Sequence, residues 1–273
     1  MLVTASNLAQ AHKTIALARK YPGFLYGTVG VHPCDANVFE RFEHPEEYLR
    51  KLEATALAGK ADGTVKAFGE IGLDNARLFL APADVQRKYF ELQLDVAERV
   101  GLPLFLHSRD CREEFERILF PRLPRLPRGG VVHSFTGTVE EMMALVEHGL
   151  YIGLNGCSLK TEENVAVARA VPLDRLLLET DAPWCELRPS HASAPYLERA
   201  RQRLGDAADE TLGLAPAVKK ERFASGKMVK GRCEPCVIVH VAAVVAEIKD
   251  VPLADVCEAA WANSQQLFGF DDA

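Results

Sequence analysis

The chain alternates seven times between a short apolar segment typical of a strand and a longer segment with helical periodicity. The strand-like segments are Met1–Thr4, Phe24–Val31, Val65–Glu70, Pro103–His107, Val131–Ser134, Leu150–Leu154 and Leu176–Glu179. Strands that alternate with helices form parallel sheets, most simply a barrel. The 273 residues suffice for a barrel, since about 250 are typical. The alternation therefore predicts an α/β protein, a TIM-type (β/α) barrel in one domain over residues 1–273.

Several helices can be placed from periodicity and capping signals. Apolar residues at three-to-four spacing predict a helix over Ala83–Val100. Thr138, with Glu141 three residues later, predicts a capped helix start, and Gly149 predicts its end. Cys236–Lys249 and Leu253–Phe268 are predicted to close the chain as two helices.

The alternation of strand-like and helical segments stops between residues 186 and 235. This stretch is long, charged and weakly periodic. A structureless loop of that length is unusual, so this inserted segment is functional or carries helices of its own. Basic residues gather within it: the stretch Gly213–Arg232 holds six basic residues and one acid, a local charge of +5. We weigh a solvated loop and a DNA-binding patch equally for this stretch.

Charge and cysteine content limit the possible environments. The net charge is −6, so a polyanion would have to be bound through a local patch or through metal ions. The seven cysteines are odd in number and irregularly spaced. Cys233 and Cys236 form a lone CxxC pair without partners at zinc-site spacing. No apolar run reaches 18 residues, which argues against a membrane span. We expect an intracellular protein, cytoplasmic, nuclear or both.

Four of the apolar segments end in, or run directly into, a residue that commonly binds metal. These residues are Glu70, His107, His133 and Asp181. Taken singly, each has an ordinary explanation, such as an exposed strand end, a core histidine or a helix cap. Because parallel strands present their carboxyl ends on one face, the four together predict a metallohydrolase site. The mixed nitrogen and oxygen ligands suit one or two divalent cations and do not choose among Mg²⁺, Mn²⁺ and Zn²⁺. We expect Mg²⁺, with Mn²⁺ or Zn²⁺ as alternatives.

Other polar residues lie close to these strand ends in the sequence and could bind substrate. His32 also ends a strand and could contact a phosphate group, donate a proton or support a ligand. Asp74 and Arg109 follow Glu70 and His107, while Ser158 and Lys160 follow the sixth strand. An arginine and a lysine can hold phosphate oxygens. A solvated loop residue is an equal alternative at each of these positions.

At these residues the sequence resembles the TatD family of metal-dependent deoxyribonucleases, especially its eukaryotic branch. The matching stretches are Thr28–Pro33 (TVGVHP), Phe68–Asp74 (FGEIGLD), Pro103–Arg109 (PLFLHSR), Gly129–Thr138 (GGVVHSFTGT), Leu150–Thr161 (LYIGLNGCSLKT) and Leu178–Trp184 (LETDAPW). The resemblance implies a β/α barrel, divalent cations, and exonuclease-like hydrolysis of DNA phosphodiester bonds by metal-activated water. By position, Glu70, His107, His133 and Asp181 match the family's metal ligands, with Glu70 and Asp181 also catalytic.

Two departures from the family pattern leave an alternative open. The family's first strand, which carries a His-x-His pair in bacterial members, has no counterpart, so the first βα unit is expected to be lacking. Arg232-Cys233-Glu234-Pro235 stands where the family usually has Arg-Asn-Glu-Pro. The alternative is an inactive, truncated TatD-like protein that binds metal or partners without catalysis. A hydrolase acting on C–N bonds is a third possibility, but such enzymes often use a modified lysine where this chain has Glu70.

Overall fold

The computed structural model describes residues 1–270, and its internal contacts divide the chain into two compact units. Unit 1 comprises Met1–His133, Glu147–Leu150 and the described residues from Ser264 onward. Unit 2 comprises Ser134–Val146 and Tyr151–Asn263. The assignment of residues 1–273 to a single domain stays a prediction. Within residues 1–270, no helix has the length and apolar character needed to cross a membrane.

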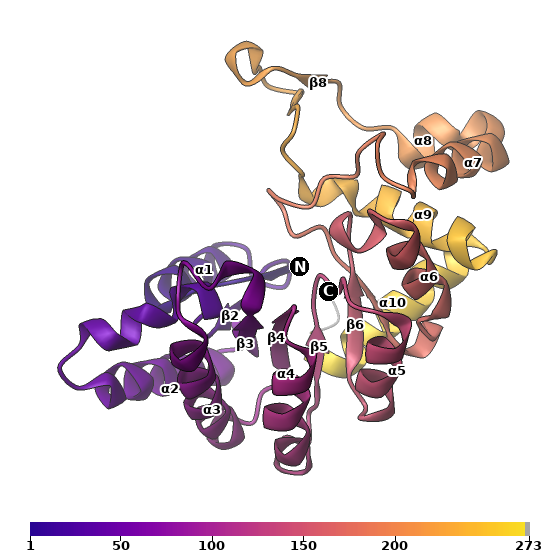
Figure 1. Cartoon of the computed structure of the whole chain (residues 1–273). Helices are drawn as coiled ribbons and strands as arrows, with labels where there is room; N and C mark the ends of the chain where they lie inside the picture. Colours follow the sequence, from indigo (N-terminus) through magenta and orange to yellow (C-terminus); the bar gives the residue numbers. More distant parts are fainter. Residues whose placement is uncertain (271–273) are drawn as a thin grey trace. The chain divides into compact units, whose positions relative to one another are not determined.

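Unit 1 alternates strands and helices, and its five strands pair in sequence order, all parallel. Its elements are β1 (Leu2–Val3), α1 (Leu8–Lys20), β2 (Tyr26–Val29), α2 (Pro45–Ala61), β3 (Val65–Asp74), α3 (Ala83–Val100), β4 (Leu104–Arg109), α4 (Arg112–Leu119) and β5 (Gly130–Val132). Helix α1 packs on β2, while α2 and α3 pack on β3 (Figure 1). The strands of this unit lie within the span that the sequence assigned to each, except that β3 and β4 extend further and β5 begins one residue earlier.

Helix α3 illustrates how the sequence positions these elements. It spans the predicted residues, and Gly101 ends it in a left-handed conformation with φ of 64°, which glycine adopts without steric cost. Its apolar face is buried, and Tyr89 on that face stacks on Phe39 with ring centroids 4.1 Å apart. Burying such aromatic rings stabilises the unit through apolar burial and ring packing.

Strand β3 differs from the prediction that it ends at Glu70, because it continues to Asp74. Its register against β4 shifts between Gly69 and Ile71, so one extra residue is accommodated at Glu70. Gly69 has φ of 153°, and a side chain there would meet the Phe105 carbonyl oxygen at 2.1 Å. The bulge therefore needs glycine, and it places Glu70 within the strand with Asp74 four residues further on.

Unit 2 begins after His133 and contains a further parallel strand pair, β6 with β7. Its elements are α5 (Val139–Glu147), β6 (Tyr151–Leu154), α6 (Glu162–Ala170), β7 (Leu176–Leu178), α7 (Ala194–Leu204), α8 (Ala208–Leu212), β8 (Ala217–Val218), β9 (Met228–Val229), α9 (Ile238–Lys249) and α10 (Leu253–Phe268). The last residue of α5 and the residues of α10 from Ser264 onward are assigned to unit 1. The predicted start of α5 is confirmed, because the Glu141 amide donates to the Thr138 hydroxyl at 3.1 Å.

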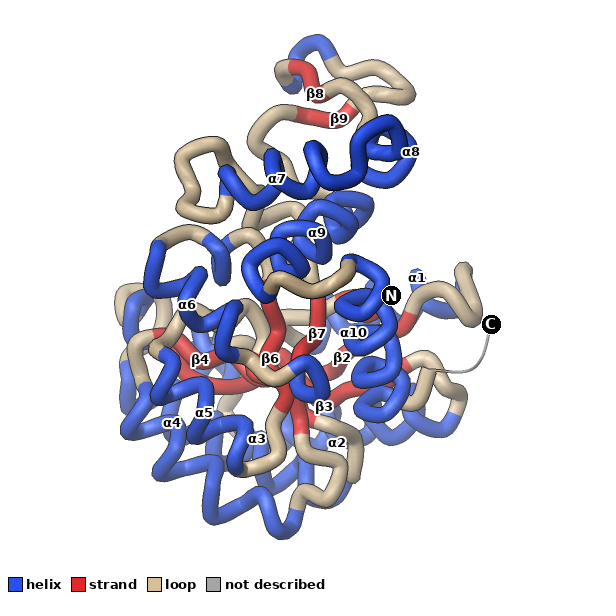
Figure 2. The backbone as a smooth tube through the Cα atoms, turned by 90° about the vertical axis from the view of Figure 1, so that its right-hand side faces the viewer, coloured by secondary structure: helices blue, strands red, loops and turns tan. Residues whose placement is uncertain are grey.

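The inserted segment carries helices of its own. Helices α7 and α8 bury Ala200 and Leu212 against Ala243 of α9. Beyond α8 the chain extends as an arm with the short pair β8–β9, which lies outside helices α7 to α9 in both views (Figures 1 and 2). The segment thus combines a packed helical part with a projecting part.

Candidate metal centre

The carboxyl ends of the strands in unit 1 bring together five of the residues singled out in the sequence. His32 follows β2, Glu70 and Asp74 belong to β3, His107 belongs to β4, and His133 follows β5. The β3–β4 register aligns Gly72 with His107 and Asp74 with Arg109. Parallel pairing thus brings together side chains that are up to 101 residues apart, from His32 to His133.

A single oxygen of Glu70 lies at the middle of this group. Its Oε1 is 2.6 Å from Nε2 of His133, 2.9 Å from Nδ1 of His107 and 3.2 Å from Nε2 of His32. The Glu70 side chain is buried. Burial alone would raise the pKa of Glu70, but the three histidines outweigh it and hold that pKa well below its usual value. Glu70 is therefore an anion within a cluster of imidazoles.

His107 faces a carboxylate on each ring nitrogen. Nδ1 lies against Glu70, and Nε2 is 3.2 Å from Oδ2 of Asp74. Burial would lower the pKa of His107, but hydrogen bonds to Asp74 and Glu70 raise it overall. Each ring nitrogen of His107 thus donates a proton to a carboxylate. If a cation displaced the Nδ1 proton, Asp74 would keep Nε2–H and so fix the tautomer whose Nδ1 lone pair faces the cation. Asp74 therefore orients the ring of His107.

His32 is constrained differently, because its Nδ1 accepts a hydrogen bond from the Cys34 backbone N–H at 3.0 Å. In the neutral ring the proton then resides on Nε2, the atom that faces Glu70. An Nε2 that carries a proton has no lone pair for a cation. His32 is thus placed as a hydrogen-bond donor.

The donor set fits a divalent cation. Potential ligand atoms of His32, Glu70 and His107 all lie within 4.8 Å of one another. The Glu70 carboxylate and His107 can coordinate a cation there, whereas His32 faces the same point as a hydrogen-bond donor. Asp74 is fully buried, and among residues 1–270 its Oδ1 has no hydrogen-bond partner. A buried carboxylate oxygen without a partner is costly unless a further group compensates it. Imidazole and carboxylate ligands together suit Zn²⁺, Mn²⁺ or Mg²⁺ without selecting one.

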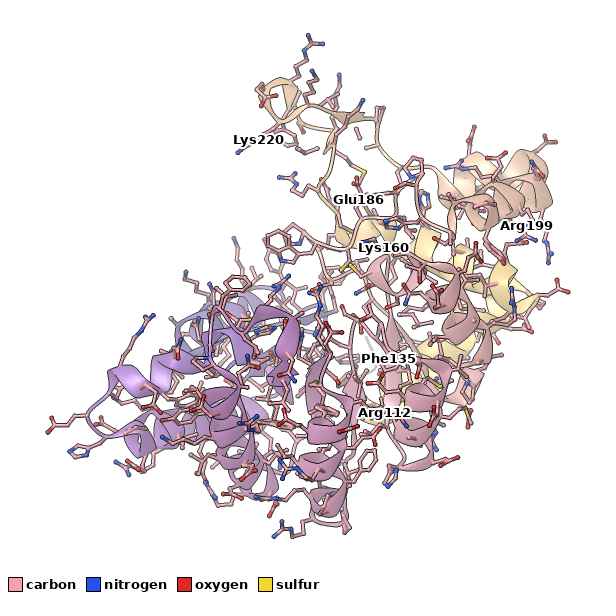
Figure 3. All side chains as sticks on the ribbon, viewed as in Figure 1. Arg112, Phe135, Lys160, Glu186, Arg199 and Lys220 are labelled. Carbon is pink, nitrogen blue, oxygen red and sulfur yellow. The ribbon has the colours of Figure 1, made fainter. Side chains whose placement is uncertain are left out.

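The remaining predicted site residues have other surroundings. Arg109 is exposed. Burial would raise the pKa of Asp74, but His107 lowers it overall, and the charge of Arg109 adds a smaller lowering effect. Asp181, Ser158 and Lys160 belong to unit 2. The buried Ser158 hydroxyl accepts from the Asn155 backbone N–H at 3.3 Å, so it supports the turn after β6. Lys160 is exposed beside this turn (Figure 3).

Asp181 lies in a tightly folded segment after β7. Its φ is 49°, and the Cys185 thiol donates to Oδ2 at 3.4 Å. The Trp184 backbone N–H donates to the Asp181 carbonyl at 2.8 Å, which closes a turn around the carboxylate. The indole of Trp184 is 70% exposed. An exposed aromatic ring therefore stands three residues from the predicted ligand.

Sequence reasoning missed a polar cluster in unit 2 formed by Ser134, Asn155 and Glu179. The Glu179 carboxylate accepts from the Ser134 backbone N–H at 3.2 Å and from the Asn155 amide at 3.3 Å. Ser134 has φ of 48°, an uncommon conformation that the cluster supports. The sequence indicates only that two members lie beside predicted ligands, since Ser134 follows His133 and Glu179 precedes Asp181 by two residues.

Comparisons with known proteins show which proteins this chain is similar to. A Deoxyribonuclease Tat-D from Schizosaccharomyces pombe is 53% identical over 268 residues, which is 98% of this chain and 82% of the relative. A crystal structure of a TatD family hydrolase from Entamoeba histolytica superposes with a TM-score of 0.83 at 30% identity, covering 98% of this chain and 83% of the other. An uncharacterized amidohydrolase from Saccharomyces cerevisiae gives 0.80 at 32% identity, covering 98% and 88%.

These similarities confirm the predicted fold class, an α/β fold of the TIM type, and the predicted enzyme class, a metal-dependent hydrolase. The model of the family described as TatD related DNase matches residues 1–269. The resemblance drawn from the six motifs is thereby confirmed, and the chain belongs to the TatD-related DNase family.

Proposed function

We propose that this protein is a metal-dependent deoxyribonuclease that hydrolyses phosphodiester bonds at the ends of DNA, inside the cell. The observation that carries the proposal is the Glu70 oxygen with three imidazole nitrogens within 3.2 Å. Two relatives support the substrate class by their names. One is the Deoxyribonuclease Tat-D already described, and the other is a 3'-5' ssDNA/RNA exonuclease TatD from Edwardsiella piscicida, 41% identical over 187 residues.

Glu70, His107 and His133, together with Asp181, are the residues that we assign to hold one or two divalent cations. A cation bound there would lower the pKa of water from about 15.7 towards about 7 and would neutralise charge on the phosphate. Asp74 holds the Nε2–H of His107, which leaves Nδ1 available as a ligand atom. Ligand rings that are fixed in this way need little reorganisation when the cation binds.

The other residues act on protons and on the phosphate. Glu70, an anion because its pKa is held low, accepts a hydrogen bond from the attacking water and orients it. His32 donates Nε2–H to a phosphate oxygen, since its Nδ1 is occupied by the Cys34 amide. Arg109 and Lys160 are exposed cations that we assign to further phosphate oxygens.

The decisive experiment measures release of nucleotides from end-labelled DNA in Mg²⁺ or Mn²⁺, with and without chelator. Glu70→Gln and Asp181→Asn should each lower turnover at least about 100-fold, because every 1.36 kcal/mol of lost transition-state stabilisation costs tenfold. Glu43→Gln is the matched control, since Glu43 is exposed. Chelator should abolish hydrolysis, and added cation should restore it.

The same measurements separate the proposal from the non-catalytic alternative. Hydrolysis that persists in Glu70→Gln would overturn the assignment of Glu70. Cation binding without hydrolysis of any DNA would favour a TatD-like protein that binds metal or partners only. Hydrolysis of amide substrates in preference to DNA would favour the third hypothesis, in which the protein is a hydrolase of C–N bonds.

A further inference from the structure

The proposed metal centre does not use the projecting arm of unit 2, residues 213–232, which we call the basic arm. It contains β8, a 3₁₀ turn over Lys220–Arg222 and β9. Its basic residues are Lys219, Lys220, Arg222, Lys227, Lys230 and Arg232, against the single acid Glu221. Figure 3 shows Lys220 on the arm, away from the helices of unit 2. The arm thus carries +5 in a chain of −6.

These charges are exposed, and most of them are not neutralised. All six basic side chains are exposed to solvent. Arg232 pairs with Glu234 at 3.1 Å. Among residues 1–270, no carboxylate forms an ion pair with the remaining five basic side chains. Five positive charges in one short arm repel one another. A bound polyanion would relieve this repulsion, so the arm favours polyanion binding.

The base of the arm is attached to the segment that carries Asp181. Met228 and Cys233 pack in one buried cluster with Ala182. The Cys233 backbone N–H donates to the Pro183 carbonyl at 3.0 Å, and the Gly231 N–H donates to the Glu186 carboxylate at 3.2 Å. The arm therefore rises from the same place as Asp181 and Trp184.

Two exposed aromatic rings accompany the charges. Phe223, at the centre of the arm, is 55% exposed, and the guanidinium of Arg232 lies 5.9 Å from its ring centroid. Trp184, at the base of the arm, is more exposed still. Exposed aromatic rings between cations are the arrangement by which proteins bind single-stranded nucleic acid, because unpaired bases stack on the rings while cations follow the backbone.

Two cations, Arg188 and Lys160, lie near the base of the arm, where Arg188 is 3.9 Å from the carboxylate of Glu186. Burial and then the charges of Arg188 and Lys160 lower the pKa of His191, which is in the same segment. The Ala192 backbone N–H donates to the Lys160 carbonyl at 3.0 Å, so these residues are held together. A strand that leaves the arm would therefore meet two cations and the Glu186 carboxylate near its base.

We propose that the basic arm binds the backbone of single-stranded DNA, that Phe223 and Trp184 stack on its bases, and that the arm leads the strand to the segment carrying Asp181. This inference rests on the proposed function, because it assigns the path of that enzyme's substrate. Single-stranded DNA fits better than a duplex, whose bases are already stacked and cannot cover Phe223.

The test is the salt dependence of binding of a labelled 15-nucleotide oligothymidine, measured by fluorescence anisotropy in chelator so that no hydrolysis occurs. Lys219→Glu/Lys220→Glu should flatten the log–log slope by about 1.4, since each phosphate contact on a single strand contributes about 0.7. The matched control is Lys13→Glu/Arg50→Glu, which changes net charge equally on exposed residues of unit 1. The control should leave the slope unchanged.

Two further measurements address the rings and the ligand. Phe223→Ala should weaken binding about fivefold or more, whereas Phe24→Ala, which removes another exposed ring, should leave it unchanged. A duplex of the same length should bind more weakly than the single strand and should not respond to Phe223→Ala. Equal binding of duplex and single strand would overturn the single-strand assignment.

Failure of this inference is distinguishable from failure of the proposed function. If the arm and control variants show the same salt slope while cation-dependent hydrolysis persists, the arm proposal is wrong and the enzyme assignment stands. If no DNA is hydrolysed, yet only the arm variants lose binding, the arm proposal stands and the catalytic proposal is wrong.

Discussion

The backbone N–H of Cys34 donates to Nδ1 of His32 at 3.0 Å, and this one contact distinguishes His32 from the other histidines of the centre. A neutral histidine has one proton, so an accepting Nδ1 leaves that proton on Nε2. His32 is therefore well placed to donate to an anion and poorly placed to ligate a cation through the same atom.

The first prediction compares His32→Gln with His107→Gln in titrations with Mn²⁺. His32→Gln should change cation affinity less than about threefold, because that side chain offers no ligand atom. His107→Gln should weaken affinity at least about tenfold, since it loses a lone pair that Asp74 orients. DNA hydrolysis should fall in both variants. An equal loss of cation affinity in the two would show that His32 rotates away from Cys34 and becomes a ligand.

The second prediction concerns Asp74, whose carboxylate is fully buried against His107. Asp74→Asn keeps the shape but removes the charge that orients the histidine. Cation affinity should fall about 10- to 100-fold, the usual cost of losing such a supporting carboxylate. Calorimetric titration with Mn²⁺ measures it, and Asp84→Asn on the exposed first turn of α3 is the control. Unchanged affinity would mean that packing alone holds His107.

Most of the fold could be predicted because strand and helix periods are local properties of the sequence. Ala83–Val100 was predicted to the residue, and Leu253–Phe268 likewise. The continuation of β3 from Glu70 to Asp74 was not predicted, because a bulge depends on the partner strand. The change of register after Gly69 arises only when β3 pairs with β4. Local patterns cannot report pairing register.

The candidate site divides in the same way. Its ligating residue types could be predicted from strand ends, but their hydrogen bonds could not. Nothing local indicates that Asp74 would reach His107, 33 residues away, or that Glu179 would hold the backbone at Ser134. Such partners are set by strand pairing, so only residue types and approximate positions are available from the sequence.

The third prediction concerns Gly72, which has φ of 146° and lies against the backbone of His107. A side chain at Gly72 would approach the His107 carbonyl oxygen to 1.9 Å. Gly72→Ala should therefore destabilise the protein by at least about 1–3 kcal/mol from backbone strain and should displace His107. Urea unfolding measures the loss, and cation titration of the folded fraction reports the displacement. Gly63→Ala, a similar left-handed position with open space around it, should show strain alone and normal cation affinity.

The last prediction concerns the dependence of stability on pH in unit 2. His240 is buried in α9, and its Nε2–H donates to the Leu212 carbonyl at 2.7 Å. Burial lowers the pKa of His240, and the positive charge of Arg201 adds to this, while the hydrogen bond to Leu212 opposes it. The unfolded chain therefore binds a proton at about pH 6.5, where the folded protein does not. The free energy of unfolding should therefore fall as the pH drops below about 6.5, and it should stop falling below the pKa of His240 in the folded protein.

His240→Gln removes this titration while keeping an N–H donor, so the fall in stability below about pH 6.5 should become shallower. Urea unfolding of the full chain across that range measures the slope. His12→Gln on α1 is the control, since His12 is exposed and its replacement should leave the slope unchanged. Comparing each variant with the parent cancels the contribution of the metal-centre histidines, because none of them is changed in either variant. Parallel pH profiles for the parent and His240→Gln would show that His240 is protonated equally in the folded and unfolded chains, and the prediction would be wrong.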